Sequence, residues 1–164
     1  MKKTILFLVF LLTAVFAEAE KSVGYLYKIF ATEGCGATYS VVCQESDYYI
    51  VARISSDRLV FTENPTMMIR TFDDEVLTFE GFCINNTASV GGVVVGSVFV
   101  PTSDIHTVAK FAITPEQFEI LRHGVAKIRL TMTPVNHDKT FKKDVLGKGL
   151  YKLYLQEKAN AEDF

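Results

Sequence analysis

The sequence lacks tryptophan and holds only three cysteines and three histidines. Three cysteines are too few for the dense disulfide framework of a small secreted scaffold. No histidine lies at the spacing of about two to five residues from another histidine or a cysteine that typical zinc ligands show. We therefore expect no metal and no other cofactor.

Catalytic signatures are also missing. The chain has no G-x-S-x-G nucleophile elbow, no H-E-x-x-H pair and no S-x-x-K motif. The glycines of residues 91–96 superficially resemble a phosphate loop, but the lysine and hydroxyl residue that should follow are absent. We predict no catalytic residue, and hence a protein that is not an enzyme.

Neither sign of charge dominates the chain. It has 17 Lys and Arg against 19 Asp and Glu, a formal net charge of −2. Such a balance gives no global attraction to nucleic acid or to anionic lipid. With 49% hydrophobic and 22% charged residues, the composition excludes a disordered or collagen-like chain and fits one globular domain.

A secretory signal peptide is predicted over residues 1–19. It begins with two lysines, continues with the apolar run 5–16 and ends in small residues. The run is shorter than the roughly 20 residues that a membrane-spanning helix needs. We expect cleavage after Ala19, with Ala17 as second choice, and a periplasmic or extracellular domain over 20–164 without a membrane span.

The first part of this domain is rich in β-branched and aromatic residues. Strands are predicted over 23–30, 38–43, 48–54 and 58–61, with a turn at 33–36. The turn prediction rests on the two glycines of that segment.

A hairpin is predicted next. Two strand-like runs, 67–72 and 75–80, are separated by the aspartates at 73–74, a residue type that tolerates tight turns. In the second run Leu77 and Phe79 share one face. Small and polar residues after this hairpin then indicate a loop.

That predicted loop covers residues 85–92, where two glycines are adjacent. Two further strands are predicted near 93–100 and 106–113.

The sequence then predicts a short helix near 115–122. Thr114 is placed as the N-cap, Pro115 at the first helical position and Gln117 as the partner in a capping box. Gly124 supplies the helix end. A half-buried strand over 125–133 follows, because apolar and polar residues alternate there.

The tail is expected to be helical. Apolar residues between 138 and 158 recur at helical spacing, although Gly147 and Gly149 weaken the pattern. Whether 144–157 is helix or strand stays open. Taken together, the patterns predict one mainly antiparallel β domain, sandwich-like or a partly open barrel, with a short helix and a C-terminal helix.

The three thiols allow at most one internal disulfide. Cys35 and Cys43 could face each other across a bend at 34–36, and we predict that pair as the candidate bridge. Pairings with Cys83, and three buried thiols without a bridge, remain open.

Two groups of polar residues are candidates for contacts with other molecules. Lys127 and Arg129 on the strand over 125–133, with Lys142 and Lys143 close behind, make the C-terminal third locally basic. They are a candidate anion or partner contact, although a solvated face is the more common meaning of such a pattern. Asp104 and His106 share a strand face and are read as a surface pair rather than a metal site.

The segments Ile113–Leu121, Gly124–Leu130 and Phe141–Asp144 carry a resemblance. They are similar to the C-terminal part of small secreted β-rich proteins of Gram-negative gut-type bacteria. The resemblance covers about 45 residues. It implies a secreted β-rich domain and transfers no active-site residue.

These observations predict a non-enzymatic secreted or periplasmic protein that acts through contacts with a protein or envelope partner. The alternative is a carrier of an apolar or amphipathic small molecule in a barrel-like cavity. The sequence leaves the partner, the ligand and the oligomeric state open.

Overall fold

The computed structural model describes residues 21–29 and 32–162. The signal peptide predicted for residues 1–19 therefore lies outside the described residues. In chain order the elements are β1 (Ser22–Ile29), β2 (Thr32–Gln44), β3 (Asp47–Ser56), β4 (Val60–Phe61), β5 (Thr66–Thr71), β6 (Val76–Val95), β7 (Val98–Ile113), α2 (Pro115–Leu121), β8 (Val125–Leu130), β9 (Met132–Thr133), β10 (His137–Thr140) and α3 (Gly147–Glu162).

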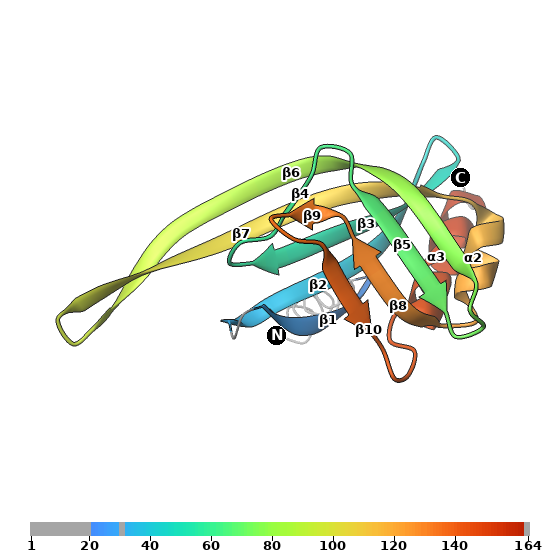
Figure 1. Cartoon of the computed structure of the whole chain (residues 1–164). Coiled ribbons are helices and arrows are strands. Elements are labelled where there is room, and N and C mark those ends of the chain that lie inside the picture. The colour runs from blue at the N-terminus through green and yellow to red at the C-terminus, as the bar shows by residue number, and fades with distance from the viewer. Residues whose placement is uncertain (1–20, 30–31, 163–164) are drawn as a thin grey trace, which may run out of the picture.

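Eight strands form one antiparallel sheet in the order β1-β2-β3-β7-β6-β5-β8-β10. The sheet curls into a half-barrel, and α2 and α3 lie at one end of it (Figure 1). Strands β4 and β9 form a separate pair. The predicted mainly β domain with a short and a C-terminal helix is confirmed.

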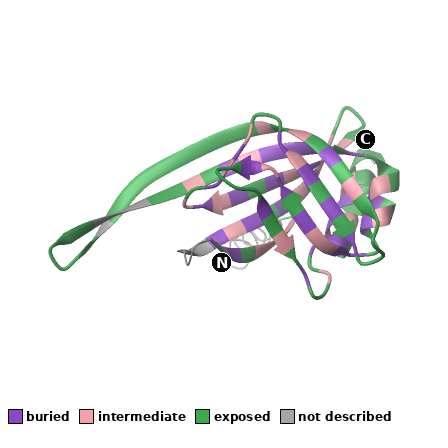
Figure 2. Cartoon of the chain, viewed as in Figure 1, coloured by how far each residue is buried: buried purple, intermediate pink, exposed green. Residues whose placement is uncertain are grey.

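Buried and exposed residues alternate along the strands of the curled sheet (Figure 2), and the buried side chains form the core on its inner face. On β5, Met67 and Ile69 are fully buried while the intervening Met68 is exposed. Met67 lies opposite Phe79 of β6 and opposite Leu130 of β8, so three buried side chains form a row across three strands. Burying each such side chain stabilises the fold by about 1.5–3 kcal/mol.

The hairpin predicted around residues 73–74 joins β5 to β6. Asp74 has a φ of 63°, and the amide of Thr71 donates to the carbonyl of Glu75 at 2.9 Å. Aspartate tolerates this left-handed conformation better than most residues. Leu77 and Phe79 share one face, as predicted; Phe79 is buried and Leu77 is half-buried there.

The capping box predicted for α2 is present. The amide of Gln117 donates to Oγ1 of Thr114 at 3.3 Å, and the amide of Thr114 donates to Oε1 of Gln117 at 2.9 Å. Pro115 occupies the first turn, where it costs no hydrogen bond. The helix buries Phe118 and Leu121 against the body.

In the tail, the segment 147–162 is the helix α3 (Gly147–Glu162), whereas the first residues of the expected helical pattern belong to the strand β10 (His137–Thr140), so the helix begins later than predicted. Its two glycines lie in the first turn, where they weaken a helix least. Asp144 begins it: Oδ1 accepts from the amides of Leu146 and Gly147 at 3.2 and 2.7 Å, and Oδ2 accepts from Lys148 at 2.8 Å. Oδ1 also accepts from Val125 at 3.0 Å, which ties α3 to the start of β8.

Four backbone donors thus converge on one carboxylate. Partial burial on its own would raise the pKa of Asp144, but these hydrogen bonds hold it below its ordinary value.

Side chains join the two edge strands of the sheet. Tyr25 of β1 hydrogen-bonds Nε2 of His137 of β10 at 2.9 Å and Tyr39 of β2 at 3.1 Å. The ring centroids of Tyr27 and His137 are 4.2 Å apart, and those of Phe141 and Tyr25 are 5.1 Å apart. We call Tyr25, Tyr27 and His137 the seam. Burial lowers the pKa of His137 to about 4.

Two sequence predictions of irregular structure are wrong. The turn expected at 33–36 is part of β2, where Gly36 pairs with Leu26 and Ser55. The loop expected at 85–92 is part of β6, which continues past a bulge at Ile84 to Val95. In both segments, pairing with neighbouring strands outweighs the weak strand propensity of glycine.

Candidate protein-interaction site

The most exposed part of the sheet is a long β-hairpin made by the outer halves of β6 and β7. On the β6 side the last backbone bond to the body is from the amide of Cys83 to the carbonyl of Glu63, at 3.0 Å. On the β7 side the last pair with β3 is Ile105 with Ser56. Beyond these points residues 84–104 form a two-stranded ribbon, which we call the arm. It projects away from the body, opposite the helices (Figure 1).

The arm presents large hydrophobic side chains to solvent. The members with described side chains have relative exposures of 53–80%: Ile84, Val90, Val94, Val95, Val98 and Phe99. In Figure 2 the part of the arm that is not grey is exposed, whereas the sheet behind it alternates between buried and exposed residues. An exposed apolar segment of this kind is typical of contact surfaces.

One face of the arm continues the inner, core-forming face of the sheet. Thr107 of β7 is buried opposite Ile54 and Asn86. A bulge between Cys83 and Asn85 shifts the alternation of β6 by one residue. Because side chains alternate along a strand, Val90 lies on this same face as Asn86, but in the arm no described element covers it.

The ring of Phe99 lies across Gly92 on this face. A Cβ atom built on Gly92 would be 2.2 Å from Cζ of Phe99. In the body, Phe111 covers Gly81 in the same way, with the corresponding distance 2.5 Å to Cδ1. An aromatic ring over a strand glycine supplies the packing that the glycine lacks. Phe111 is the direct partner of Gly81, whereas Phe99 reaches Gly92 diagonally, so the arm contains one cross-strand contact of this kind.

The arm ends in a two-residue turn at Gly96 and Ser97. Gly96 has a φ of 65°, as the first central residue of a type II′ turn requires. A turn of this length makes Val95 and Val98 a hydrogen-bonded pair, and such pairs then alternate down the ribbon. The backbone groups of the intervening residues on β6 therefore point to its outer edge: Asn86, Ala88, Val90, Gly92 and Val94.

The edge of β7 differs from the edge of β6. Pro101 lies opposite Gly92, at a position whose amide would point outward, and proline has no amide hydrogen. Proline at this position blocks strand addition. The β6 edge from Asn86 to Val94 carries no proline and no charge, and no described strand pairs with it.

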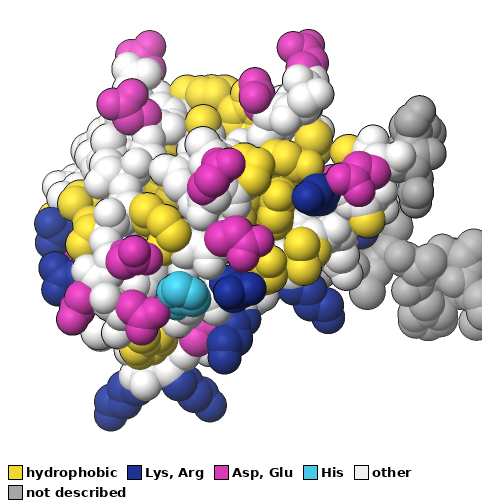
Figure 3. Space-filling view, turned by 90° about the vertical axis from the view of Figure 1, so that its right-hand side faces the viewer, with side chains coloured by type: hydrophobic (Ala, Val, Ile, Leu, Met, Phe, Trp, Pro, Cys, Tyr) yellow, Lys and Arg dark blue, Asp and Glu magenta, His cyan; other side chains and the backbone are white. Residues whose placement is uncertain are grey.

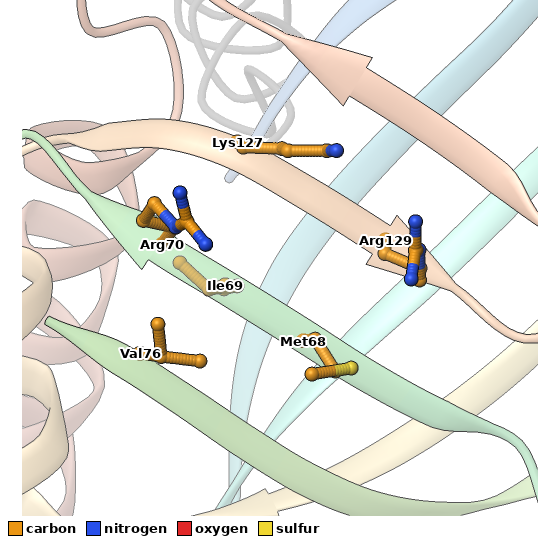
Figure 4. A pocket seen from close by; sticks show the side chains of 6 residues that line it. All are labelled: Met68, Ile69, Arg70, Val76, Lys127 and Arg129. Atoms are coloured by element: carbon orange, nitrogen blue, oxygen red, sulfur yellow. The ribbon is translucent and has the colours of Figure 1, made fainter. Parts of the chain in front are cut away.

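The predicted basic group is only partly assembled. Lys127 and Arg129 lie on the outer face of β8, where with Arg70, Met68 and Val76 they line a shallow depression of about 190 Å³ (Figure 4). Arg70 was not among the predicted residues, although its alternation with Ile69 in the strand over 67–72 indicates an outward position.

One carboxylate, that of Asp138, offsets part of the positive charge that Arg70, Lys127 and Arg129 give this depression. Arg129 donates to both carboxylate oxygens of Asp138, at 2.7 and 3.2 Å, and Lys127 lies 4.0 Å from the same group. The hydrogen bond from Arg129 lowers the pKa of Asp138. Lys142 and Lys143 are exposed in the segment between β10 and α3 and do not line the depression. We therefore assign no ligand to these four residues.

The predicted bridge between Cys35 and Cys43 is wrong. Both residues lie on β2, eight positions apart, which in a strand is a separation of about 26 Å. All three thiols are free. Cys35 is buried on the inner face opposite Tyr27. The glycines that suggested a bend belong to the extended strand.

Asp104 and His106 lie where the arm meets the body. Nδ1 of His106 is 2.6 Å from Oγ of Ser55, and Nε2 is 3.2 Å from Oδ2 of Asp104. Serine, histidine and aspartate in a row are also the components of a hydrolase catalytic triad. In that triad Nε2 of the histidine contacts the serine and Nδ1 contacts the aspartate, whereas here Nδ1 contacts Ser55 and Nε2 contacts Asp104. The Asp104 side chain is also 63% exposed, whereas the triad buries its carboxylate. The contact supports a surface network, as the sequence predicted for Asp104 and His106.

Within residues 21–29 and 32–162, no group of three or more His, Cys, Asp or Glu side chains is placed to hold a metal ion. No helix in this part of the chain is long and apolar enough to cross a membrane. No protein-family model, curated protein or solved structure matches the chain. The resemblance to small secreted proteins of Gram-negative bacteria therefore stays a prediction.

Proposed function

We propose that this protein is a secreted or periplasmic, non-enzymatic binding protein whose arm makes its protein contacts. The observation that carries this proposal is the arm itself, a paired two-stranded ribbon with exposed Val90, Val94 and Phe99 and an open backbone edge. A two-stranded hairpin is marginally stable alone in water, and a third strand or a packed face stabilises it. Export rests on the sequence of residues 1–19 alone.

The chemistry of the arm defines the kind of contact. Residues 81–103 contain no Asp, Glu, Lys, Arg or His. Recognition is therefore by backbone hydrogen bonds and apolar packing, the mode known as β-strand addition. Asp104, at the base of the arm, is its one charged residue. The helix end of the body, in contrast, shows Lys, Arg, Asp and Glu interspersed with hydrophobic residues (Figure 3).

No specific observation in the described residues favours the alternative function, a carrier of a small molecule in a barrel-like cavity. Inner-face residues such as Ile50, Phe111 and Leu130 have no exposed surface, because side chains from the sheet and the helices pack against them. The carrier remains a prediction from the sequence.

Site-directed photocrosslinking in the native host tests the proposed function. A photoreactive phenylalanine analogue at Val94 should give a discrete protein adduct on irradiation. The same analogue at Lys152, an exposed residue of α3 at the other end of the molecule, is the matched control and should give none. Equal adducts at both positions, or none at Val94, would contradict the assignment to the arm.

A further inference from the structure

We infer that the partner strand on the open edge of β6 is β6 of a second copy of this chain, so that two arms pair antiparallel about a two-fold axis. This inference rests on the proposed function, since it names the occupant of the same edge. It follows from the backbone polarity of the edge, its lack of charge, the closed edge of β7 and the length of the arm.

The outward-pointing residues of β6 are self-complementary. Pairing around Val90 places that residue opposite its own copy, Ala88 opposite Gly92, and Asn86 opposite Val94. Each of the five residues from Asn86 to Val94 that points outward then uses its amide and its carbonyl in hydrogen bonds across the axis. The product is a four-stranded sheet in the order β7-β6-β6-β7, which exceeds the minimum of three strands for independent stability.

An uncharged edge is best matched by an uncharged partner strand, and the β6 edge of a second copy is uncharged. When identical strands pair about a two-fold axis, any charged residue near the axis meets a like charge, which destabilises the pair. Between Glu80 and Asp104 the chain has no charged residue, so self-pairing carries no such penalty. Exposed edge strands of other proteins often carry lysine, which prevents pairing with another strand.

The edge of β7 explains why the assembly stops at two. An arm with two open edges would add copies without limit. Pro101 removes the outward amide in the middle of the β7 edge, and Ser103 donates its hydroxyl to the carbonyl of Asp57 at 2.8 Å. Because each chain then has a single open edge, pairing of two chains uses both open edges and leaves none for a third copy.

The length of the arm keeps the two bodies apart. From Asn86 to Val94 the strand spans roughly 30 Å at about 3.4 Å per residue. The chain has a net negative charge, but repulsion between exposed charges is largely screened beyond about 8 Å at physiological salt. The bodies therefore do not oppose pairing of the arms.

Sedimentation velocity of the purified mature protein over a series of concentrations tests this inference. The wild type should shift from monomer to dimer. Val90→Pro removes an outward amide without breaking a β6–β7 bond, and should weaken dimerisation by roughly tenfold or more, a loss of at least about 1.4 kcal/mol. Val90→Thr keeps the amide and the branched shape and should dimerise within a few-fold of the wild type.

A second variant guards against local misfolding by proline. Val90→Lys retains the amide but places two like charges face to face on the axis, and should also stay monomeric at concentrations where the wild type is a dimer. A wild type that is monomeric at every concentration, dimers of Val90→Pro as tight as the wild type, or a ladder of higher oligomers would each overturn the two-fold arrangement.

The outcome also separates this inference from the proposed function. A monomeric wild type whose Val94 analogue crosslinks a different protein in cells overturns the self-pairing and leaves the function of the arm standing. A monomeric wild type with no adduct at Val94 overturns both.

Discussion

The hydroxyl of Tyr25 lies 2.9 Å from Nε2 of His137, and this contact joins the first and last strands of the eight-stranded sheet. No backbone ladder between β1 and β10 is present in the described residues. The curl of the sheet is instead held at its seam by a hydrogen bond and by the rings of Tyr25, Tyr27 and His137. Because His137 is buried there, the seam has a defined dependence on pH.

The first prediction is that acidification weakens the fold through His137. Burial lowers the pKa of its imidazole to about 4, with Asp138 raising and Lys139 lowering it to smaller extents. The unfolded chain binds a proton near pH 6.5, whereas the folded chain does not until about pH 4. The free energy of unfolding should therefore fall between these pH values, by up to about 3 kcal/mol.

Urea unfolding at pH 7 and pH 5 measures this effect. In His137→Asn the part of the loss due to His137 should disappear, although the variant is less stable at pH 7 because it loses the contact with Tyr25. Equal pH dependence in the variant and the wild type would show that the seam histidine does not titrate in this way.

The second prediction concerns Asp144, the carboxylate that accepts four backbone amides. Asp144→Ala leaves those donors without a partner and should lower the free energy of unfolding by roughly 2–4 kcal/mol at neutral pH. Since the pKa of Asp144 is lowered in the fold, this stability is present above the ordinary carboxyl pKa and is lost as the pH falls through the folded value. Chemical denaturation of Asp144→Ala at neutral and acid pH measures both effects, with Lys143→Ala, an exposed neighbour, as control.

The third prediction is that Gly147→Ala destabilises the protein, although alanine is the better helix former. A Cβ at position 147 would lie 2.4 Å from the carbonyl oxygen of Leu121 and 2.7 Å from Cα of Gly124. Both contacts are to backbone, so α3 must shift, at a cost of about 1–3 kcal/mol. Thermal unfolding should show a lower midpoint for Gly147→Ala and an unchanged one for Lys148→Ala, whose side chain is exposed.

The fourth prediction is that the pair of Arg129 and Asp138 contributes little. Both side chains are more than 40% exposed, so solvent weakens their attraction despite two hydrogen bonds. A double-mutant cycle with Arg129→Ala and Asp138→Ala should give a coupling energy below about 1 kcal/mol. A coupling of several kcal/mol would mean that the outer face of β8 is structurally important.

Local patterns predicted those parts of the fold that local interactions determine. The capping residues around Thr114, the aspartates of the turn at 73–74 and the alternation along β8 each act within a few residues, and the structure confirms them. The arm was missed because small and glycine residues between 85 and 92 resemble a loop. Its strand structure depends on pairing with β7, up to 23 residues later in the chain.

Long-range relationships were not accessible in the same way. Tyr25 and His137 are 112 positions apart, and no spacing rule connects them. The Cys35–Cys43 prediction failed because a bend was inferred from glycines that lie in a paired strand. The one available signal for the arm was the absence of charge from residue 81 to residue 103 in a chain that is 22% charged.

Residue-resolved amide exchange by NMR tests the central claim most directly, because inward and outward amides alternate along β6. Ser89 and Gly91 bond to β7 in every state. If the edge of β6 is closed by a second copy, Ala88, Val90 and Gly92 should exchange as slowly as these two at high protein concentration and faster on dilution. Fast exchange of Ala88, Val90 and Gly92 at every concentration would contradict the pairing.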